Sequence, residues 1–431
     1  MILKKIIHKF SFAREGIIAL AIKIFGAIFT VSYSLILSRQ FNSEGVGLYY
    51  LANSIIIVAI IISKFGFENA LIKYISIYFN ERKGGTIKLI EKKSVKISII
   101  LSIILMLLLV SGSHFVSTRI FDEYNLVFFL NIMTFSILPL TLVALYSAIF
   151  KGIDAVNLGM ITESNIKPLF NILIIGIAIF LFSIDDIKAI PIGYLIGTIF
   201  TYALTMILWK KKKNKLNSSL DSSFKYHEVL KTARPLMMVN ALNYILSSTD
   251  TLMLGFYKTA SVVGIYNIAT KVTVISSFIL VSVNSLYGPK FAILAYTFQK
   301  IKLKKMYKLI SRLLLCLSII IFVATILFHK LLLGVFGVEF LQGKYILYIA
   351  AIGQFFLLAT GPVGVLLMVS GYEKLHRNNT IFCAVLNIVL NAVLIPKYGG
   401  EGAAIATSFS LIVKNLYATY IMKREFGFFI Y

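Results

Sequence analysis

Residues 94–116, SVKISIILSIILMLLLVSGSHFV, form a continuous apolar run with a single lysine and no carboxylate. About 20 such residues form a helix that crosses a bilayer and satisfies its backbone hydrogen bonds internally. Similar runs recur along the whole chain, so we expect twelve membrane-spanning helices. They lie at 16–38, 45–66, 94–116, 125–150, 160–182, 187–209, 233–254, 265–288, 309–332, 343–370, 379–396 and 402–422.

The composition predicts an all-α polytopic membrane protein. Of the 431 residues, 58% are hydrophobic and only 14% are charged, which excludes a soluble globular enzyme. The apolar residues form long runs rather than alternating, which disfavours an outer-membrane barrel. No segment between the runs is long enough for a soluble catalytic domain, so we expect neither enzymatic activity nor a cofactor.

The basic residues predict the orientation. The net charge is +25, but in a membrane protein such an excess reflects lysine and arginine in cytoplasmic loops rather than nucleic-acid binding. With twelve spans, thirty basic residues lie on one side and seven on the other. This distribution predicts a multi-pass protein of the bacterial cytoplasmic membrane with both termini in the cytoplasm. The first run lacks a cleavage pattern, so we expect it to remain as the first helix.

An internal repeat divides the chain. VGLYYLA at 46–52 returns as VGIYNIA at 263–269, an offset of about half the chain, and each copy opens an even-numbered run. The polar stretch KKKKNKLNSSLDSS at 210–223 lies near the midpoint and has the composition of a linker. We therefore expect two six-helix bundles, residues 1–216 and 217–431, around a central cavity.

Three further expectations concern local features of the sequence. The basic, amphipathic stretch 67–93 is expected to lie on the inner leaflet. Pro139, Pro168 and Pro362 lie inside apolar runs and are expected to kink their helices. The five histidines are scattered and the two cysteines lie in apolar runs, so we expect no metal site and no disulfide.

Three segments resemble a known family. Residues 387–407, NIVLNAVLIPKYGGEGAAIAT, are similar to the carboxy-terminal signature of Wzx-type polysaccharide flippases, in the multidrug/oligosaccharidyl-lipid/polysaccharide exporter superfamily. DTLMLG at 250–255, together with the second repeat copy, is another match, and SEGVGLY at 43–49 is a third. The resemblance implies alternating-access transfer of an undecaprenyl-diphosphate-linked oligosaccharide to the outer leaflet. The partners that it implies are this lipid-linked glycan, membrane lipids, a polysaccharide polymerase and a chain-length regulator.

Charged residues inside the runs are the candidate site. A lysine that faces lipid near a helix centre is costly, so such a residue faces protein or a watery lumen. A lipid diphosphate is anionic, and ammonium groups in a low-dielectric lumen attract it. We therefore expect a cationic lumen formed by Lys23, Lys167, Lys271 and Lys414.

Polar and acidic residues could form the coupling site. Asp250 shares a helical stripe with Asn240, Asn243 and Ser247, and Asn267 shares a face with Lys271. Glu163 is a second acidic candidate, but its i,i+4 spacing to Lys167 also allows simple neutralisation. The choice between protons, sodium and membrane potential stays open.

The sequence disfavours three other functions. A cation-coupled multidrug antiporter needs acidic cavity residues, whereas the first run has no acid and most intramembrane charges are lysines. A lipid II flippase of the same superfamily resembles a fourteen-span protein. A membrane glycosyltransferase or polymerase would be expected to carry a larger loop with catalytic groups.

Overall fold

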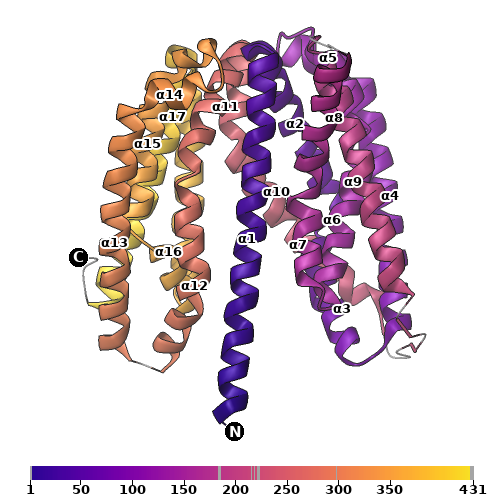
Figure 1. The fold of residues 1–431 in the computed structure, drawn as a ribbon, viewed down its shortest axis with the longest axis vertical. Helices are drawn as coiled ribbons and strands as arrows, with labels where there is room; N and C mark the ends of the chain where they lie inside the picture. The colour runs from indigo at the N-terminus through magenta and orange to yellow at the C-terminus, as the bar shows by residue number, and fades with distance from the viewer. Residues whose placement is uncertain are drawn as a thin grey trace. The chain divides into compact units, whose positions relative to one another are not determined.

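The computed structural model describes residues 2–182, 186–214, 216–217, 219–220, 224–297 and 299–427. These residues form helices joined by short turns, and they contain no strand. Contacts between Cα atoms group them into two units. The amino-terminal unit contains residues 17–248, and the carboxy-terminal unit contains residues 249–431 together with 1–16. The expectation of an all-α polytopic protein is confirmed (Figure 1).

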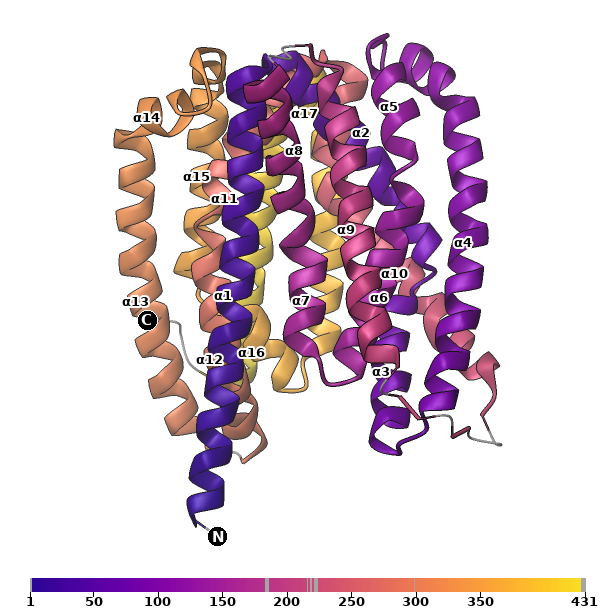
Figure 2. The ribbon, with the colours of Figure 1, turned by 45° about the vertical axis from the view of Figure 1, so that its right-hand side comes forward.

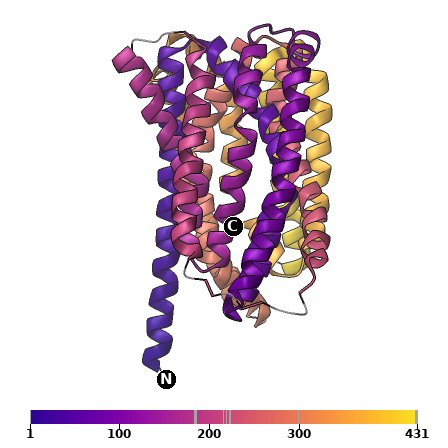
Figure 3. The same cartoon turned by 90° about the vertical axis from the view of Figure 1, so that its right-hand side faces the viewer.

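The helices of the first part of the chain run from α1 to α10. Helix α1 is one continuous helix, indigo in Figure 3. The bounds of the helices from α1 to α10 are α1 Ile2–Gln40, α2 Ser43–Lys64, α3 Phe67–Asn80, α4 Gly84–Phe115, a π-helical turn Val116–Ile120, α5 Leu126–Thr134, α6 Ile137–Gly152, α7 Val156–Ser164, α8 Ile166–Phe182, α9 Ala189–Lys213 and α10 Tyr226–Tyr257.

The remaining helices belong to the carboxy-terminal unit. In that unit α15 packs against both α13 and α17 (Figure 1). The bounds are α11 Ala260–Val274, α12 Ser277–Tyr296, α13 Lys300–Leu327, α14 His329–Gly334, a 3-10 turn Val338–Gly343, α15 Lys344–Ala359, α16 Val363–Val369 and α17 Glu373–Phe426.

Every expected apolar run is mostly helical, although several are divided between two helices. Eight helices, or ten if each of two bent pairs is one span, are long and apolar enough to cross a membrane among the described residues. Helix α17 consists of two helices merged across Gly399, which has φ 56° and ψ −130°. The run 233–254 lies within α10, which is not among these candidates, so the expected number of twelve stays a prediction.

The three prolines lie at breaks in the helices, as expected. Pro139 lies in the first turn of α6, and α5 and α6 are bent by 47°. Pro168 lies in the first turn of α8, just after the break that separates α7 from α8. Pro362 precedes α16. A proline lacks the N–H that would continue the hydrogen-bond ladder, so each helix restarts nearby.

The apolar face of the amphipathic stretch 67–93 packs largely against neighbouring helices. The stretch forms α3 and the start of α4, and the buried face of α3 packs against α6. Phe67, Ala70, Leu71 and Ile75 are fully buried in a core that α6 and Trp209 complete. An amphipathic helix can bury its apolar face against neighbouring helices as well as in a leaflet, and the position of this stretch on the inner leaflet stays a prediction.

The boundary between the units lies within α10, between Ser248 and Thr249. The first part of α10 belongs to the amino-terminal unit because it packs on α3 and α4. Tyr74 Oη donates to Glu228 O at 3.1 Å, and the hydroxyls of Ser94 and Tyr226 are 3.0 Å apart. The division at 216/217 into two bundles around a cavity stays a prediction.

Candidate functional site: an acidic and a basic cluster

The carboxylate of Asp250 is the centre of a polar cluster in the carboxy-terminal unit, which we call the acidic cluster. Three neighbouring groups donate hydrogen bonds to it. Tyr266 Oη is 2.6 Å from Oδ2, and Thr407 Oγ1 is 2.5 Å from the same atom. Asn391 Nδ2 is 2.6 Å from Oδ1. The negative charge is therefore held by short hydrogen bonds, which charge-assisted pairs favour.

A second layer of bonds ties these donors together. Asn391 Nδ2 also donates to Asn387 Oδ1 at 3.1 Å, and Asn387 Nδ2 donates to Thr407 Oγ1 at 2.9 Å. Asn391 is fully buried, and Asn387 is nearly so. The cluster thus offers carboxylate, amide and hydroxyl oxygens within one buried network, and hard cations prefer such oxygen ligands. A proton or a small monovalent cation fits this chemistry.

The local backbone explains how these residues meet. Asn387 and Asn391 are one turn apart on α17, and Thr407 follows after the break in the same helix. Gly399 adopts φ 56° and ψ −130°, values that suit the first central residue of a type II′ turn and favour glycine. Gly402 allows close packing after the turn, because a Cβ there would lie 2.4 Å from Leu394 O.

Residues of the signature 387–407 therefore donate hydrogen bonds to Asp250 in addition to packing the helices together. Sequence reasoning identified Asp250 but missed its partners, which are Asn387, Asn391, Thr407 and Tyr266. A pair of asparagines at i,i+4 in an apolar helix was the available signal, because buried amides require partners.

A cationic cluster occupies the amino-terminal unit. Lys167 Nζ, on α8, donates to Tyr194 Oη at 2.8 Å and lies 4.2 Å from the centroid of the same ring. Tyr194 Oη in turn donates to Asn53 Oδ1 at 3.0 Å. Tyr194 is fully buried on α9. We call these three residues the basic cluster.

The alternative that Glu163 neutralises Lys167 is wrong. Glu163 forms an ion pair with Lys151 instead, and its side chain is half exposed. The i,i+4 rule fails because it applies within one helix, whereas α7 ends at Ser164 and α8 begins at Ile166. Lys167 therefore donates to the neutral Tyr194 hydroxyl, while Glu163 pairs with Lys151.

The other expected lysines lie on three different helices. Lys23 is exposed on α1, Lys271 is partly exposed in the last turn of α11, and Lys414 is partly buried on α17. Asn379 Nδ2 donates to the backbone oxygen of Lys414 at 2.8 Å. That these three lysines and Lys167 line one lumen stays a prediction.

The remaining polar candidates are divided between the units. Asn240 is partly exposed and Asn243 is exposed, and both lie in the part of α10 that belongs to the amino-terminal unit. Asn267 lies in the carboxy-terminal unit, where Thr251 Oγ1 donates to its Oδ1 at 3.3 Å. The side chain of Ser247 lies outside the described residues. The shared stripe with Asp250 stays a prediction.

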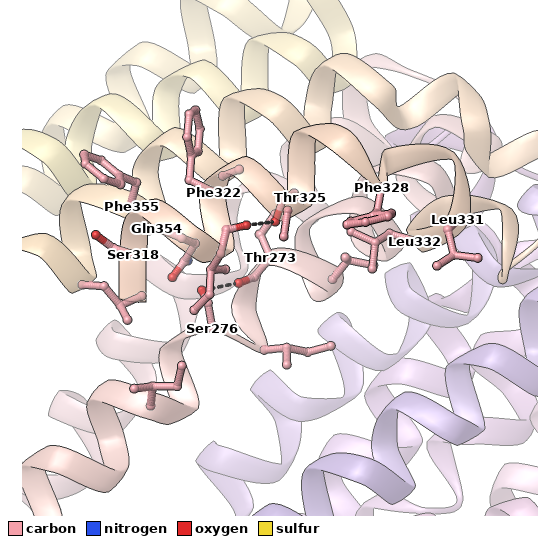
Figure 4. Close-up of a pocket in the computed structure, with 17 residues that line it drawn as sticks. Thr273, Ser276, Ser318, Phe322, Thr325, Phe328, Leu331, Leu332, Gln354 and Phe355 are labelled. Atoms are coloured by element: carbon pink, nitrogen blue, oxygen red, sulfur yellow. Dashed lines mark hydrogen bonds between the residues drawn. The ribbon is translucent and has the colours of Figure 1, made fainter. Parts of the chain in front are cut away.

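A cavity of about 460 Å³ lies in the carboxy-terminal unit, next to the bend between α11 and α12 (Figure 4). Its lining comes from α11 to α15 and is mostly apolar, with Thr273, Ser276, Ser318, Thr325 and Gln354 as polar members. None of the expected site residues lines it. Among the described residues no group of three or more histidine, cysteine or acidic side chains could hold a metal.

Comparison with known proteins places the chain among glycan-pathway proteins. A family model described as polysaccharide biosynthesis protein matches residues 12–292. The chain is 28% identical over 243 residues to the probable low-salt glycan biosynthesis flippase Agl15 of Haloferax volcanii. It is 23% identical over 237 residues to the capsular polysaccharide biosynthesis protein CapF of Staphylococcus aureus. The matches cover 55% and 54% of this chain and 49% and 59% of those proteins, so the chain spans about half the length of the curated relatives it matches.

Solved structures show the same fold. An inward-facing multidrug resistance transporter of the MATE family superposes with a TM-score of 0.76 at 13% identity, over 96% of this chain and 98% of that one. The lipid II flippase MurJ superposes with a TM-score of 0.70 at 16% identity, over 94% and 87%. A MOP superfamily transporter from Pyrococcus furiosus gives 0.66 at 12% identity, over 96% and 95%. At such identities the likeness concerns the fold alone.

Proposed function

The chain belongs to the polysaccharide biosynthesis protein family, and from this premise we propose that it is a flippase for a lipid-linked oligosaccharide. Its substrate is an undecaprenyl-diphosphate-linked repeat unit, moved from the inner to the outer leaflet of the bacterial cytoplasmic membrane by alternating access. In the outer leaflet a polymerase and a chain-length regulator would take over the glycan.

The basic cluster is the observation that carries this proposal. Glu163 pairs with Lys151 rather than with Lys167, whose own partner is the neutral Tyr194 hydroxyl. A cation held in this way suits an anionic diphosphate and repels a cationic drug. This argument favours the glycan flippase over the multidrug antiporter, although both share the fold.

The acidic cluster supports coupling to a cation. A proton or sodium ion bound at the Asp250 carboxylate would replace hydrogen bonds that Asn391, Thr407 and Tyr266 donate to it. Binding free energy at that site could then shift the equilibrium between the two access states, provided that the ion binds one state better.

The test uses cells from which the gene has been deleted and then restored on a plasmid. Lipid-linked glycan in the outer leaflet is labelled on intact cells with a membrane-impermeant reagent, and total lipid-linked glycan is measured after lysis. We expect deletion to lower the labelled fraction and raise the total, and restoration to reverse both. Unchanged labelling, or restored efflux of cationic dyes in place of glycan export, would overturn the proposal.

The topology is tested on the same cells. Cysteine introduced at Lys258 or Lys397 should react with an impermeant thiol reagent from outside, because both lie on the side with few basic residues. Cysteine at Lys211 or Lys304 should react only after lysis. The opposite pattern would reverse the proposed orientation.

A further inference from the structure

A basic crevice of about 480 Å³ lies at the Gly84 end of α4, beside the end of α9, within the amino-terminal unit. It is separate from both charge clusters described above. Its lining combines charged and apolar side chains: Lys88, Glu91, Lys92, Val95, Lys96, Ile99, Ile100 and Lys213.

Three of its lysines form a ladder. Lys88, Lys92 and Lys96 are spaced i, i+4 and i+8 on α4 and therefore share one face of the helix. Like charges at this spacing destabilise a helix, so an anion bound among them would relieve the repulsion. Lys92 and Lys96 are exposed, and neither forms an ion pair within the part of the chain that the structure describes.

The carboxylate of the crevice does not neutralise this ladder. Glu91 is buried and accepts a hydrogen bond from Trp209 Nε1 at 2.7 Å, and its Oε2 is 2.8 Å from Lys213 Nζ. Four lysines and one glutamate leave the lining with three net positive charges. Glu91 thus fixes Lys213 at the rim while the ladder stays cationic.

One more contact orients the ladder. Lys88 Nζ donates to Leu216 O at 3.0 Å, which holds its ammonium group beside the end of α9. Asn217 Oδ1 accepts from the N–H of Gly84 at 2.7 Å, so the linker also caps the start of α4. The crevice is therefore built by tertiary contacts and is more than a row of solvated lysines.

The same face of α4 becomes apolar directly after Lys96. Ile100, Ile103, Ile104 and Leu107 follow at i+4, i+7, i+8 and i+11 and are between 44% and 66% exposed. In Figure 2, α4 runs along one side of the amino-terminal unit. Exposed apolar side chains on a membrane helix contact lipid chains.

We propose that this crevice is a specific binding site for an anionic glycerophospholipid. Its phosphate lies among Lys88, Lys92 and Lys96, and its acyl chains lie along the apolar stripe that begins at Ile100. Basic pockets beside transmembrane helices recognise anionic headgroups in this way. A free phosphate shares the headgroup chemistry, but it would leave the adjoining stripe unused.

The experiment measures lipid-dependent thermal stability of the purified full chain. Mixed micelles containing phosphatidylglycerol are compared with micelles containing phosphatidylcholine of the same acyl chains, and with inorganic phosphate alone. The test variant is Lys92→Gln/Lys96→Gln. The matched control is Lys210→Gln/Lys211→Gln, which removes the same charge from exposed positions outside the crevice.

We expect phosphatidylglycerol to raise the unfolding temperature of the wild type and of the control. The test variant should bind phosphatidylglycerol about 30-fold more weakly, because each lysine near an anionic headgroup contributes about a factor of five in affinity. Lys92→Arg/Lys96→Arg should restore binding, which separates lost charge from lost folding. Equal loss in the control, equal stabilisation by phosphatidylcholine, or equal stabilisation by phosphate alone would overturn the proposal. No glycan enters this assay, so its outcome is independent of the proposed flippase activity.

Discussion

The two units hold opposite charges in similar polar surroundings. In the amino-terminal unit a lysine is bonded to a tyrosine hydroxyl that is bonded to an asparagine, and in the carboxy-terminal unit an aspartate accepts from a tyrosine hydroxyl and an asparagine. Both arrangements place one partly buried ionisable side chain among neutral partners. The difference suggests a division of labour, with the cation available to an anionic substrate and the carboxylate available to a coupling ion.

The internal repeat makes the comparison more specific. Tyr266 belongs to the second repeat copy, and its counterpart 217 positions earlier is Tyr49. The counterpart of Asp250 at the same offset is Tyr33. Tyr33 and Tyr49 pack edge to face with ring centroids 5.6 Å apart, so an aromatic pair occupies the place of the carboxylate–tyrosine pair. The acidic cluster is therefore a feature of one unit rather than of the repeat.

The largest effect is expected at Lys167. Replacing it by glutamate puts a negative charge beside the buried Tyr194 and should abolish export of lipid-linked glycan, because an anionic substrate would be repelled. Lys167→Arg should retain much activity, since a point charge suffices. Surface glycan is measured per molecule of membrane-inserted protein. Export by the glutamate variant at the wild-type rate would remove Lys167 from the substrate path.

Asp250→Asn should have the second largest effect. The substitution keeps the size of the side chain but removes the charge that a coupling cation requires. We expect export to fall roughly 10- to 100-fold, the equivalent of one lost charge-assisted hydrogen bond. The decisive measurement is how export responds to sodium concentration and to pH. A variant that keeps the wild-type response would show that coupling takes place elsewhere.

The sequence predicts the helices better than it predicts the contacts between them. The apolar runs predicted every long helix because the bilayer imposes one length and one polarity on each. Asp250 could be suspected from its charge, but its contacts with Asn391 and Thr407 join residues far apart in the chain. Such contacts depend on how helices pack and on the turn at Gly399, and no local pattern specifies them. The alternative that Glu163 pairs with Lys167 failed for a related reason, because a helix break changed the neighbours of Glu163.

A moderate effect is expected at Gly399. Its backbone has φ 56° and ψ −130°, so Gly399→Ala should cost about 1–3 kcal/mol of strain at the turn that brings Thr407 to Asp250. The space is open enough that the strain comes from the backbone alone, since the nearest atom to a new Cβ is Lys258 Cε at 3.7 Å. Thermal unfolding of the purified protein checks this.

The matched control for Gly399 is Gly176→Ala. Gly176 lies in the interior of α8, and a Cβ there would meet nothing within 4 Å. Alanine favours a helix over glycine by about 1 kcal/mol, so this variant should unfold at the same temperature or higher. If both variants lose stability equally, the turn at Gly399 has no special role in holding the acidic cluster.

The smallest effect is expected at Glu163, and it sharpens the contrast with Asp250. Both are acidic residues that the sequence allows as coupling sites, but Glu163 is half exposed and paired with Lys151 between α6 and α7. Exposed ion pairs contribute at most about 1 kcal/mol, because water already screens the charges. Glu163→Gln should therefore leave export and its dependence on sodium and pH close to those of the wild type, measured beside Asp250→Asn. If the two variants lost cation dependence to the same extent, the acidic cluster could not be the single coupling site, and the division of labour between the units would fail.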